Sequence, residues 1–401
     1  MINRPSNFLL LKKIFLFISF VASLNALAAD QFSKAIPNIP FAIPPIYESA
    51  TYFSEGLAAV KINHKWGFID KAGKIVIEPQ FNLWQARFNT HFSDGLVAVN
   101  FNNGKDETFN QDGNSVSNIK WGFADKNGRL VIAPKFEGEY WNPPRFTEGL
   151  APVIYSSMFP GSAVMVGIGA KYGYIDKSSE FIIKPIYDEA FNFSEGLAAV
   201  TLDGKEGYIN SKGDVFIPLK YKFASSFSNG YAIVSTDGSR YFFIDKLGNK
   251  PFDKTFEDLS DFSDGLARFS ENGKFGFIDT KGNVVIKPFI ENSSIVDWSV
   301  GNSWFSEGLC AVKFGYDKNK KDEIDNGKYG YIDKTGKVVI NPRFDEAYAF
   351  KNGKALVQIN RKSFLIDKAG NRISQYFDDT SFESDGMIQV RANGKYGFIK
   401  N

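Results

Sequence analysis

The chain has 401 residues, of which 43% are hydrophobic and 16% aromatic, so it holds enough apolar material for a sizeable core. Lys and Arg number 47 against 45 Asp and Glu, and this balance gives no electrostatic reason to expect a nucleic acid partner. A single cysteine excludes an internal disulfide, while 36 glycines and 40 phenylalanines favour β structure with many tight turns.

Residues 1–28 have the pattern of a secretory signal peptide. Three basic residues flank or precede an apolar stretch over 14–24, and Ala-Leu-Ala at 26–28 fits a cleavage site. The apolar stretch is too short to span a bilayer comfortably, although a retained membrane anchor is the alternative. We therefore expect an exported protein, periplasmic or secreted, with no transmembrane segment in the mature chain. That mature chain has 44 basic and 45 acidic residues.

Residues 29–52 read as a lead-in and a partial repeat. The stretch FAIPPIYESA at 41–50 resembles IIKPIYDEAF at 182–191, which is the tail of a later repeat unit. The chain stops at KYGFIKN and lacks that tail. The first segment could therefore complete the last unit and close a ring.

Residues 53–401 contain nine repeat units, each built from two short elements. The first element is FSEGLAAV at 53–60, and the second is KWGFID at 65–70. Aligned on the glycine of the second element, the copies fall at 67, 122, 173, 207, 242, 276, 330, 364 and 397. The basic period is about 34 residues, with about twenty extra residues in three units.

With these elements the chain resembles the WG-repeat (KWG-repeat) family, a bacterial repeat family generally without assigned catalysis. The resemblance extends over nearly all of residues 41–401. It departs in two units, where Phe242 and Phe364 replace the glycine. The resemblance implies an exported bacterial repeat protein.

Each unit is predicted to form three short strands, over 56–62, 65–70 and 74–77 in the first unit. The hairpin turn after the second strand ends in a glycine that supplies positive φ, except at Ser179, where we expect strain of about 1 kcal/mol. The FSEG stretch is expected to form another turn, in which the Ser and acidic side chains accept backbone N–H groups. Because the acid recurs at the same place, as Glu55, Asp94, Glu148, Glu195, Asp264 and Glu307, we interpret it as structural and not catalytic.

The strands are apolar on both faces, as in Leu57-Ala58-Ala59-Val60 and Ile75-Val76-Ile77, so we expect both faces to be covered. The predicted fold is all-β: small antiparallel sheets stacked face to face, in either a propeller-like ring or an open β superhelix. Gly67 and Ala58 would let an aromatic ring of the next unit approach the backbone. Nine units exceed the usual four to eight blades, which weighs against the ring.

Two sets of insertions interrupt the units. One set lies between the first and second strands, at 100–119, 154–170 and 312–327, and the other follows the third strand, at 82–91, 137–145 and 289–304. Strand parity places both sets on one edge of the array, where repeat proteins display binding loops. The second set holds the candidate ligand-binding residues Trp84, Trp141, Trp298 and Trp304. These rings could instead cover the ends of their own sheets.

The residue types that catalysis or metal binding requires are scarce. Two histidines and Cys310 stand apart from any cluster with metal-ligand spacing, and no nucleophile elbow, phosphate loop or dinucleotide fingerprint appears. We therefore expect no metal, no cofactor and no enzymatic activity. A hydrolase would need a non-repeated acid pair, for which Glu137 and Glu139 are the best candidates.

The leading hypothesis is an exported, non-enzymatic scaffold that binds an envelope or extracellular protein through the loops on one edge. The alternative is a carbohydrate or cell-wall binding module that uses the loop tryptophans. Loss of glycan binding in Trp141→Ala and Trp298→Ala would favour the alternative, and saturable capture of one protein would favour the scaffold.

Overall fold

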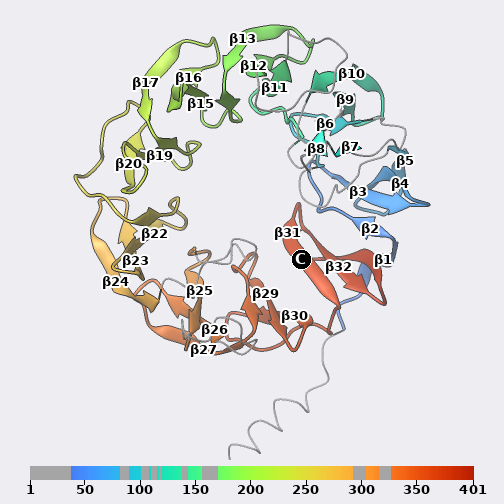
Figure 1. Ribbon diagram of the computed structural model, residues 1–401. Helices are drawn as coiled ribbons and strands as arrows, with labels where there is room; N and C mark the ends of the chain where they lie inside the picture. The colour runs from blue at the N-terminus through green and yellow to red at the C-terminus, as the bar shows by residue number, and fades with distance from the viewer. Residues whose placement is uncertain are drawn as a thin grey trace, which may run out of the picture.

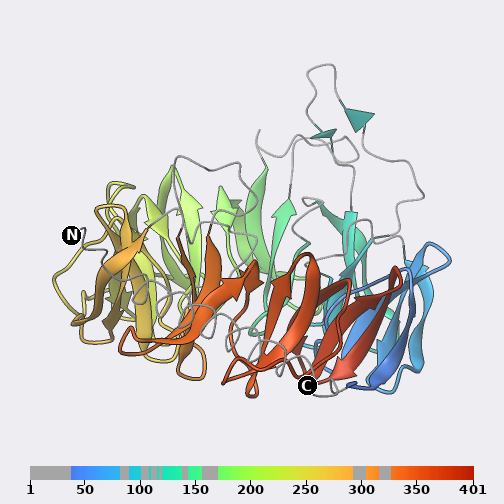
Figure 2. The ribbon, with the colours of Figure 1, turned by 90° about the horizontal axis from the view of Figure 1, so that it is seen from below.

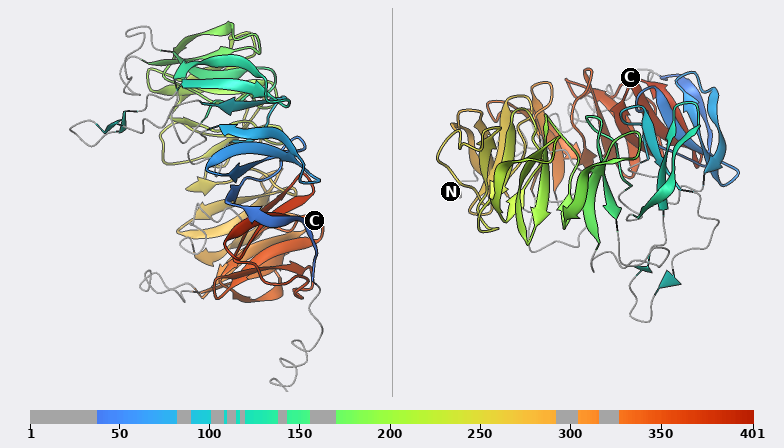
Figure 3. Two further views of the ribbon diagram at one scale, coloured as in Figure 1. Left: turned by 90° about the vertical axis from the view of Figure 1, so that its right-hand side faces the viewer. Right: turned by 90° about the horizontal axis from the view of Figure 1, so that it is seen from above.

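A computed structural model describes residues 38–81, 90–100, 108–109, 115–116, 120–137, 143–155, 170–291, 304–315 and 327–401. Strands account for all of the regular structure in these ranges. Eight antiparallel sheets follow one another around a closed ring, seen face-on in Figure 1 and edge-on in Figure 3. With each sheet counted as a blade, the fold is an eight-bladed β-propeller. The prediction of an all-β, propeller-like ring is confirmed, and the open superhelix is excluded.

A complete unit has four antiparallel strands, which we call inner, second, third and outer. Figure 1 shows the outer strands β13, β17, β24 and β27 along the rim of the ring. The inner strands are β2 (Ser49–Ala50), β14 (Glu189–Ala190), β18 (Phe223–Ala224), β21 (Asp258–Leu259), β28 (Glu346–Ala347) and β31 (Asp379–Ser384). The outer strands are β5 (Ile75–Phe81), β10 (Leu130–Glu137), β13 (Phe181–Tyr187), β17 (Val215–Tyr221), β24 (Val284–Glu291), β27 (Val338–Phe344) and, for the last unit, β1 (Phe41–Tyr47).

The two central strands recur in every unit. The second strands are β3 (Leu57–Ile62), β6 (Leu96–Val99), β11 (Ala151–Tyr155), β15 (Leu197–Leu202), β19 (Tyr231–Ser235), β22 (Leu266–Glu271), β25 (Leu309–Phe314), β29 (Lys354–Ile359) and β32 (Met387–Ala392). The third strands are β4 (Lys65–Asp70), β9 (Lys120–Asp125), β12 (Lys171–Ile175), β16 (Lys205–Asn210), β20 (Phe242–Asp245), β23 (Lys274–Asp279), β26 (Lys328–Asp333), β30 (Lys362–Asp367) and β33 (Lys395–Lys400).

Eight sheets accommodate nine repeats because one sheet spans two of them. A single residue pair, Glu137 with Ile154, joins β10 of one unit to β11 of the next, which makes a six-stranded sheet. The inner strand is only two residues long in most units. A period of about 34 residues therefore suffices for a four-stranded unit.

The N-terminal strand closes the ring. β1 pairs antiparallel with β33, so that Phe41 lies opposite Ile399 and Tyr47 opposite Tyr396. The side chain of Gln375 holds the backbone of Ile39 through both its N–H and its carbonyl, each at 2.9 Å. The first segment thus supplies the outer strand that the last unit lacks, as the resemblance between 41–50 and 182–191 predicted.

The hydrophobic core lies between neighbouring sheets. One buried cluster combines Leu197 and Tyr208 of β15 and β16 with Val234 and Phe242 of the next sheet. The aromatic residue of the third strand meets the Phe of the following FSEG element edge to face, with ring centroids 5.1 Å apart for Phe68 and Phe92. Because each sheet buries its face only against the next, no unit has a complete core by itself.

The glycine of the KWG element makes room for the outer strand of its own unit. A Cβ atom on Gly67 would lie 2.5 Å from the carbonyl oxygen of Ile77 and 2.8 Å from the nitrogen of Pro79. The expectation that Gly67 admits an aromatic ring from the next unit was therefore wrong. The two units with Phe242 and Phe364 have three-stranded sheets that lack a regular outer strand, so there the glycine is dispensable.

The outer strands carry exposed apolar residues, which corrects a second expectation. Ile75 and Val76 are exposed, and only Ile77 and Phe81 of β5 are buried. The rim strand has no neighbour on its far side, so its first residues face solvent. A proline interrupts the rim strand in most units, as Pro79 does in β5. A proline lacks the N–H that another chain's edge strand would need, which protects the rim from aggregation.

Candidate functional site

The FSEG element forms a tight turn that leads into the second strand. In the first unit Ser54 and Leu57 exchange two backbone hydrogen bonds, and Glu55 and Gly56 both have positive φ. The predicted turn is confirmed. The turn points the Ser and acidic side chains toward the next unit, away from their own backbone.

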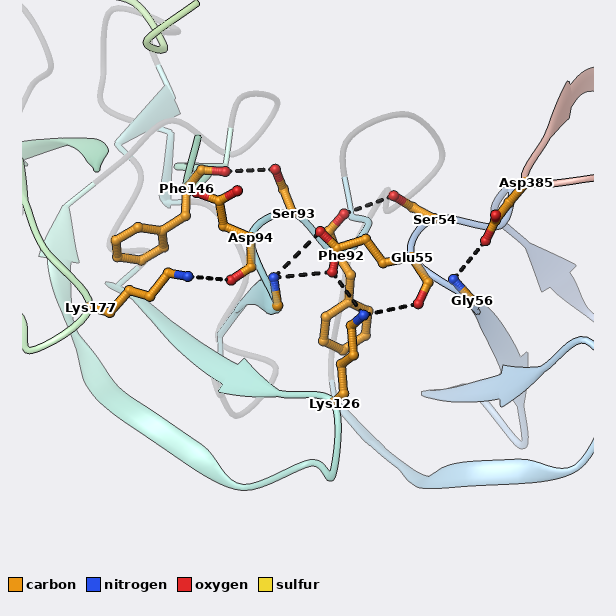
Figure 4. Close-up of polar contacts among 11 residues, drawn as sticks. Ser54, Glu55, Gly56, Phe92, Ser93, Asp94, Lys126, Phe146, Lys177 and Asp385 are labelled. Carbon is orange, nitrogen blue, oxygen red and sulfur yellow. Dashed lines mark hydrogen bonds and ion pairs between the residues drawn. The ribbon is translucent and has the colours of Figure 1, made fainter. Parts of the chain in front are cut away.

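These side chains bind neighbouring units together, as Figure 4 shows. Ser54 donates through Oγ to the carbonyl of Phe92 at 2.8 Å, and Gly95 N–H donates to the Glu55 carboxylate at 3.1 Å. Lys126, in the hairpin turn of that same next unit, lies 3.0 Å from the same carboxylate. The Ser was expected to accept an N–H group, but it donates to a carbonyl.

The same contacts recur around the ring, and we call them the belt. Backbone N–H groups of the next unit's glycine donate to the acid in the pairs Gly149–Asp94, Gly196–Glu148, Gly230–Glu195, Gly308–Asp264, Gly353–Glu307 and Gly56–Asp385. Partial burial opposes ionisation of Asp264, Glu307 and Asp385, but the lysine and N–H partners prevail and lower the pKa of each. The acids therefore have a structural role in joining the units.

The insertions emerge from the opposite face. Belt turns lie where the third strands end, since Leu57 pairs with Asp70. All six insertions leave the sheets where the third strands begin. In five of them the last strand residue before the insertion pairs with a residue at the start of a third strand: Phe81–Trp66, Glu137–Lys120, Glu291–Lys274, Tyr155–Lys171 and Phe314–Lys328. In the sixth, β6 ends at Val99, which pairs with Gly122 near the start of β9. We call this side the insertion face. Figure 2 shows the teal hairpin of β7 (Thr108–Phe109) and β8 (Ser115–Val116) standing clear of the ring on one side.

The residue just before the FSEG Phe lies on the inner side of each unit and differs from unit to unit. In chain order the first eight are Tyr52, His91, Arg145, Asn192, Ser226, Asp261, Trp304 and Ala349. Sequence reasoning missed this position because it searched for what the units share. The variation beside an invariant Phe was the signal that could have revealed it.

Three of these residues, from three successive units, form one hydrogen-bonded cluster. Tyr52 Oη lies 2.8 Å from His91 Nδ1, and Arg145 Nη1 lies 2.8 Å from His91 Nε2. The rings of Tyr52 and His91 are 5.1 Å apart between centroids. All three side chains are half-buried. We call this group the Tyr-His-Arg cluster.

The donors and acceptors in the cluster fix its protonation. A guanidinium only donates, so Nε2 of His91 must accept, and the neutral ring carries its proton on Nδ1. Nδ1–H then donates to Tyr52 Oη, which leaves the hydroxyl hydrogen of Tyr52 available for another acceptor. Burial and then the charge of Arg145 lower the pKa of His91 to about 4, against a smaller opposing effect of Glu55. Burial also raises the pKa of Tyr52.

The sequence family follows from the repeats that build this ring. The family model described as a WG containing repeat matches residues 41–66, 66–105, 121–155, 172–205, 207–239, 241–275, 275–288 and 329–362, which is more than half of the chain. The protein belongs to the WG-repeat family. No curated protein sequence matches this WG-repeat protein significantly.

Solved structures align with this chain at low sequence identity. The crystal structure of a eukaryotic initiation factor aligns with a TM-score of 0.56 and 14% identity, over 92% of this chain and 94% of that chain. The C-terminal WD40 domain of Sif2 aligns with a TM-score of 0.38 and 11% identity, over 92% and 99% of the two chains. The WD40 propeller domain of Doa1 gives 0.28 and 10%, over 92% and 95%. The first of these shows a common fold and nothing further.

Of the four predicted binding residues, only Trp304 belongs to the part that the structure describes. It is 41% exposed and stands on the inner side of its unit, directly before the buried Phe305. Trp84, Trp141 and Trp298 lie outside the described residues.

The acid pair considered for a hydrolase gains no support. Glu137 accepts a hydrogen bond from Lys120 Nζ at 2.6 Å, across the β9–β10 pair, and Glu139 lies outside the described residues. Within the described ranges, no three His, Cys, Asp or Glu side chains are grouped so that they could hold a metal ion. Cys310 is buried, as expected of a small hydrophobic residue. No helix in those ranges has the length and apolarity to cross a membrane.

Proposed function

We propose that this WG-repeat protein is an exported, non-catalytic scaffold that binds another protein through its insertion face. The observation that supports the proposal is that one face carries the shared residues that join the units, and the other face carries the insertions. The belt uses the shared acids and lysines to hold the ring, whereas the residues that differ between units leave the sheets at the other face. Variable segments on a rigid scaffold are where repeat proteins bind their partners.

Export is proposed from the sequence. Residues 1–28 fit a signal peptide, and the stability of the ring depends on packing and the belt, without a disulfide. We accordingly place the partner in the cell envelope or outside the cell.

The test is crosslinking of the full chain in cells that express it, followed by identification of attached proteins. The informative variant replaces residues 102–119 with Asp-Gly, the two-residue turn that joins β15 to β16 at Asp203–Gly204. Val99 pairs with Gly122 as Val200 pairs with Gly207, so the shortened loop would leave the same number of residues between the paired Val and Gly in both units. Shortening this insertion should abolish the crosslinks. Lys212→Ala, an exposed change in a hairpin turn of the belt face, serves as the control and should leave them unchanged.

A carbohydrate-binding role is the second candidate, and the exposed ring of Trp304 favours it. An exposed aromatic face can stack on a sugar ring. Binding to a glycan array that is lost in Trp304→Ala, with no saturable protein partner, would replace the scaffold proposal with this one.

A further inference from the structure

We propose that the Tyr-His-Arg cluster binds a carboxylate group, with Arg145 as the charged donor and Tyr52 as the second donor. The inference rests on the proposed function, because it names the chemistry by which the partner protein is recognised. The partner would offer an Asp or Glu side chain or its C-terminal carboxylate. His91 positions the two donors and need not touch the ligand.

The first argument is that Arg145 has no counter-charge among the residues that the structure describes. A half-buried cation without an anion loses hydration and gains no ion pair in return. Among the described residues Arg145 forms one hydrogen bond, to the neutral ring of His91, and its Nε is enclosed without a partner. The nearby carboxylate of Glu55 is already bound by Gly95 and Lys126.

The other half-buried arginines of the ring show what a purely structural arginine does here. Each has an acceptor or an aromatic face that accounts for its position: Arg240 with the Thr255 carbonyl at 2.7 Å, Arg268 with Asp258 at 2.9 Å, Arg372 over Tyr376 and Arg391 over Tyr396. Arg145 has neither a carboxylate, nor a carbonyl, nor a ring face among the described residues. A ligand carboxylate would supply the partner that Arg145 lacks.

The second argument is pre-organisation. The guanidinium of Arg145 is fixed through Nη1 by His91, and His91 is fixed in turn by Tyr52. The tautomer of His91 leaves the Tyr52 hydroxyl hydrogen without an acceptor inside the cluster. One cation and one hydroxyl donor are thus held by three separate units before any ligand arrives, which lowers the entropic cost of binding.

Charge decides which oxyanion fits. The cluster contributes a single positive charge, because His91 is neutral and Lys126 is balanced by Glu55. A carboxylate carries one negative charge, whereas a phosphate group carries nearly two and favours sites with more than one cation. His91 and Arg145 stand at the C-terminal ends of two insertions, 82–91 and 137–145, each two residues before a belt turn. A partner that contacts these insertions would therefore reach the cluster with an extended side chain or terminus.

The experiment titrates the full chain at low ionic strength and pH 7 with acetyl-Gly-Gly-Phe bearing a free carboxylate, with the corresponding amide, and with inorganic phosphate. Binding is followed by NMR of arginine side chains labelled with ¹⁵N. We expect the Arg145 Nε–H resonance to shift with the carboxylate peptide, weakly with phosphate and not with the amide. Equal shifts with peptide and amide, or tighter binding of phosphate, would overturn the assignment.

Variants separate the roles of the three residues. Arg145→Gln should weaken carboxylate binding by about 10- to 100-fold, and Tyr52→Phe, which keeps the ring and removes only the hydroxyl, by a few-fold. Ser226→Ala changes the equivalent position of another unit and should have no effect. Should Arg145→Gln perturb folding, as judged by its thermal unfolding, Tyr52→Phe alone decides, and unchanged affinity in that variant counts against the site.

The two proposals fail separately. If the partner crosslinks to the insertion face with equal yield in wild type and Arg145→Gln, and the free peptide does not bind, the carboxylate site is refuted and the scaffold remains. If the peptide binds as expected but no partner is captured, the site remains and the scaffold proposal is refuted.

Discussion

Asp385 accepts a hydrogen bond from the backbone N–H of Gly56 at 2.6 Å, although the two residues are 329 positions apart. Lys71 lies 3.0 Å from the same carboxylate, and Ser384 donates to the carbonyl of Phe53 at 2.7 Å. The last unit thus contacts the first through the same bonds that join the first unit to the second. The belt therefore also joins the last unit to the first, which are far apart in the sequence.

Substituting Asp385 should loosen the ring at this one junction. We expect Asp385→Ala to lower the free energy of unfolding by about 1 to 2 kcal/mol, because the Gly56 N–H and Lys71 lose their acceptor. Asp264→Ala removes the matching contacts with Gly308 and Lys334 inside the continuous part of the ring. Hydrogen exchange should accelerate in β1 and β33 only in Asp385→Ala, and the same acceleration in both variants would contradict the closure role.

Adding one methyl group at the glycine of the KWG element should be costly. In Gly330→Ala the new Cβ would lie 2.5 Å from the Ile340 carbonyl and 2.8 Å from the nitrogen of Pro342, so β27 would have to move. We expect a loss of about 2 to 4 kcal/mol in urea unfolding. Gly238→Ala is the control, since its positive φ strains alanine but its surroundings are open, and it should cost about 1 kcal/mol. Comparable losses of stability in Gly330→Ala and Gly238→Ala would argue against a close approach of β27 to Gly330.

The stability of the ring should depend on pH through His91. Its pKa is about 4 in the folded chain and about 6.5 when unfolded. As the pH falls from 6.5 toward 4, the unfolded state binds the proton first, so the free energy of unfolding falls, by about 2 kcal/mol after allowance for partial exposure. In His91→Gln the decline between pH 7 and 4 should be smaller by that amount. A wild-type slope that survives unchanged in the variant would exclude His91 as its source.

Replacing Ser179 with glycine should stabilise the protein. Ser179 has a φ of 70° in the hairpin turn where other units have glycine, which confirms the predicted left-handed conformation. We expect Ser179→Gly to raise the free energy of unfolding by about 1 kcal/mol or less, after loss of the exposed contact with Lys135. Ser178→Gly should destabilise, because it adds backbone freedom where no positive φ is needed. Thermal unfolding of both variants measures the difference, and a destabilised Ser179→Gly would show that the strain is absent.

Local patterns in the sequence determined the strands and turns of each unit. Period, hairpin glycines and apolar runs are set by contacts between residues a few positions apart, so Lys65–Asp70 was predicted with the bounds that the structure shows. The same holds for the ring closure, because the tail-like stretch at 41–50 is itself a local copy of a unit's outer strand. The alternating direction of successive strands within a unit was also sufficient to predict that the insertions lie on one face.

Only the tertiary structure decided what lies between units. The Ser54–Phe92 bond and the Tyr52–His91–Arg145 cluster join residues about 40 to 90 positions apart, and no local pattern specifies which neighbour each side chain meets. The role of Gly67 was misjudged within its own unit, since its constraint is the backbone of the outer strand ten residues later, which the tertiary structure brings against it. Comparison of the repeats identifies the residues that all units share. The residues that differ between units, on which the proposed recognition depends, become neighbours only in the folded ring.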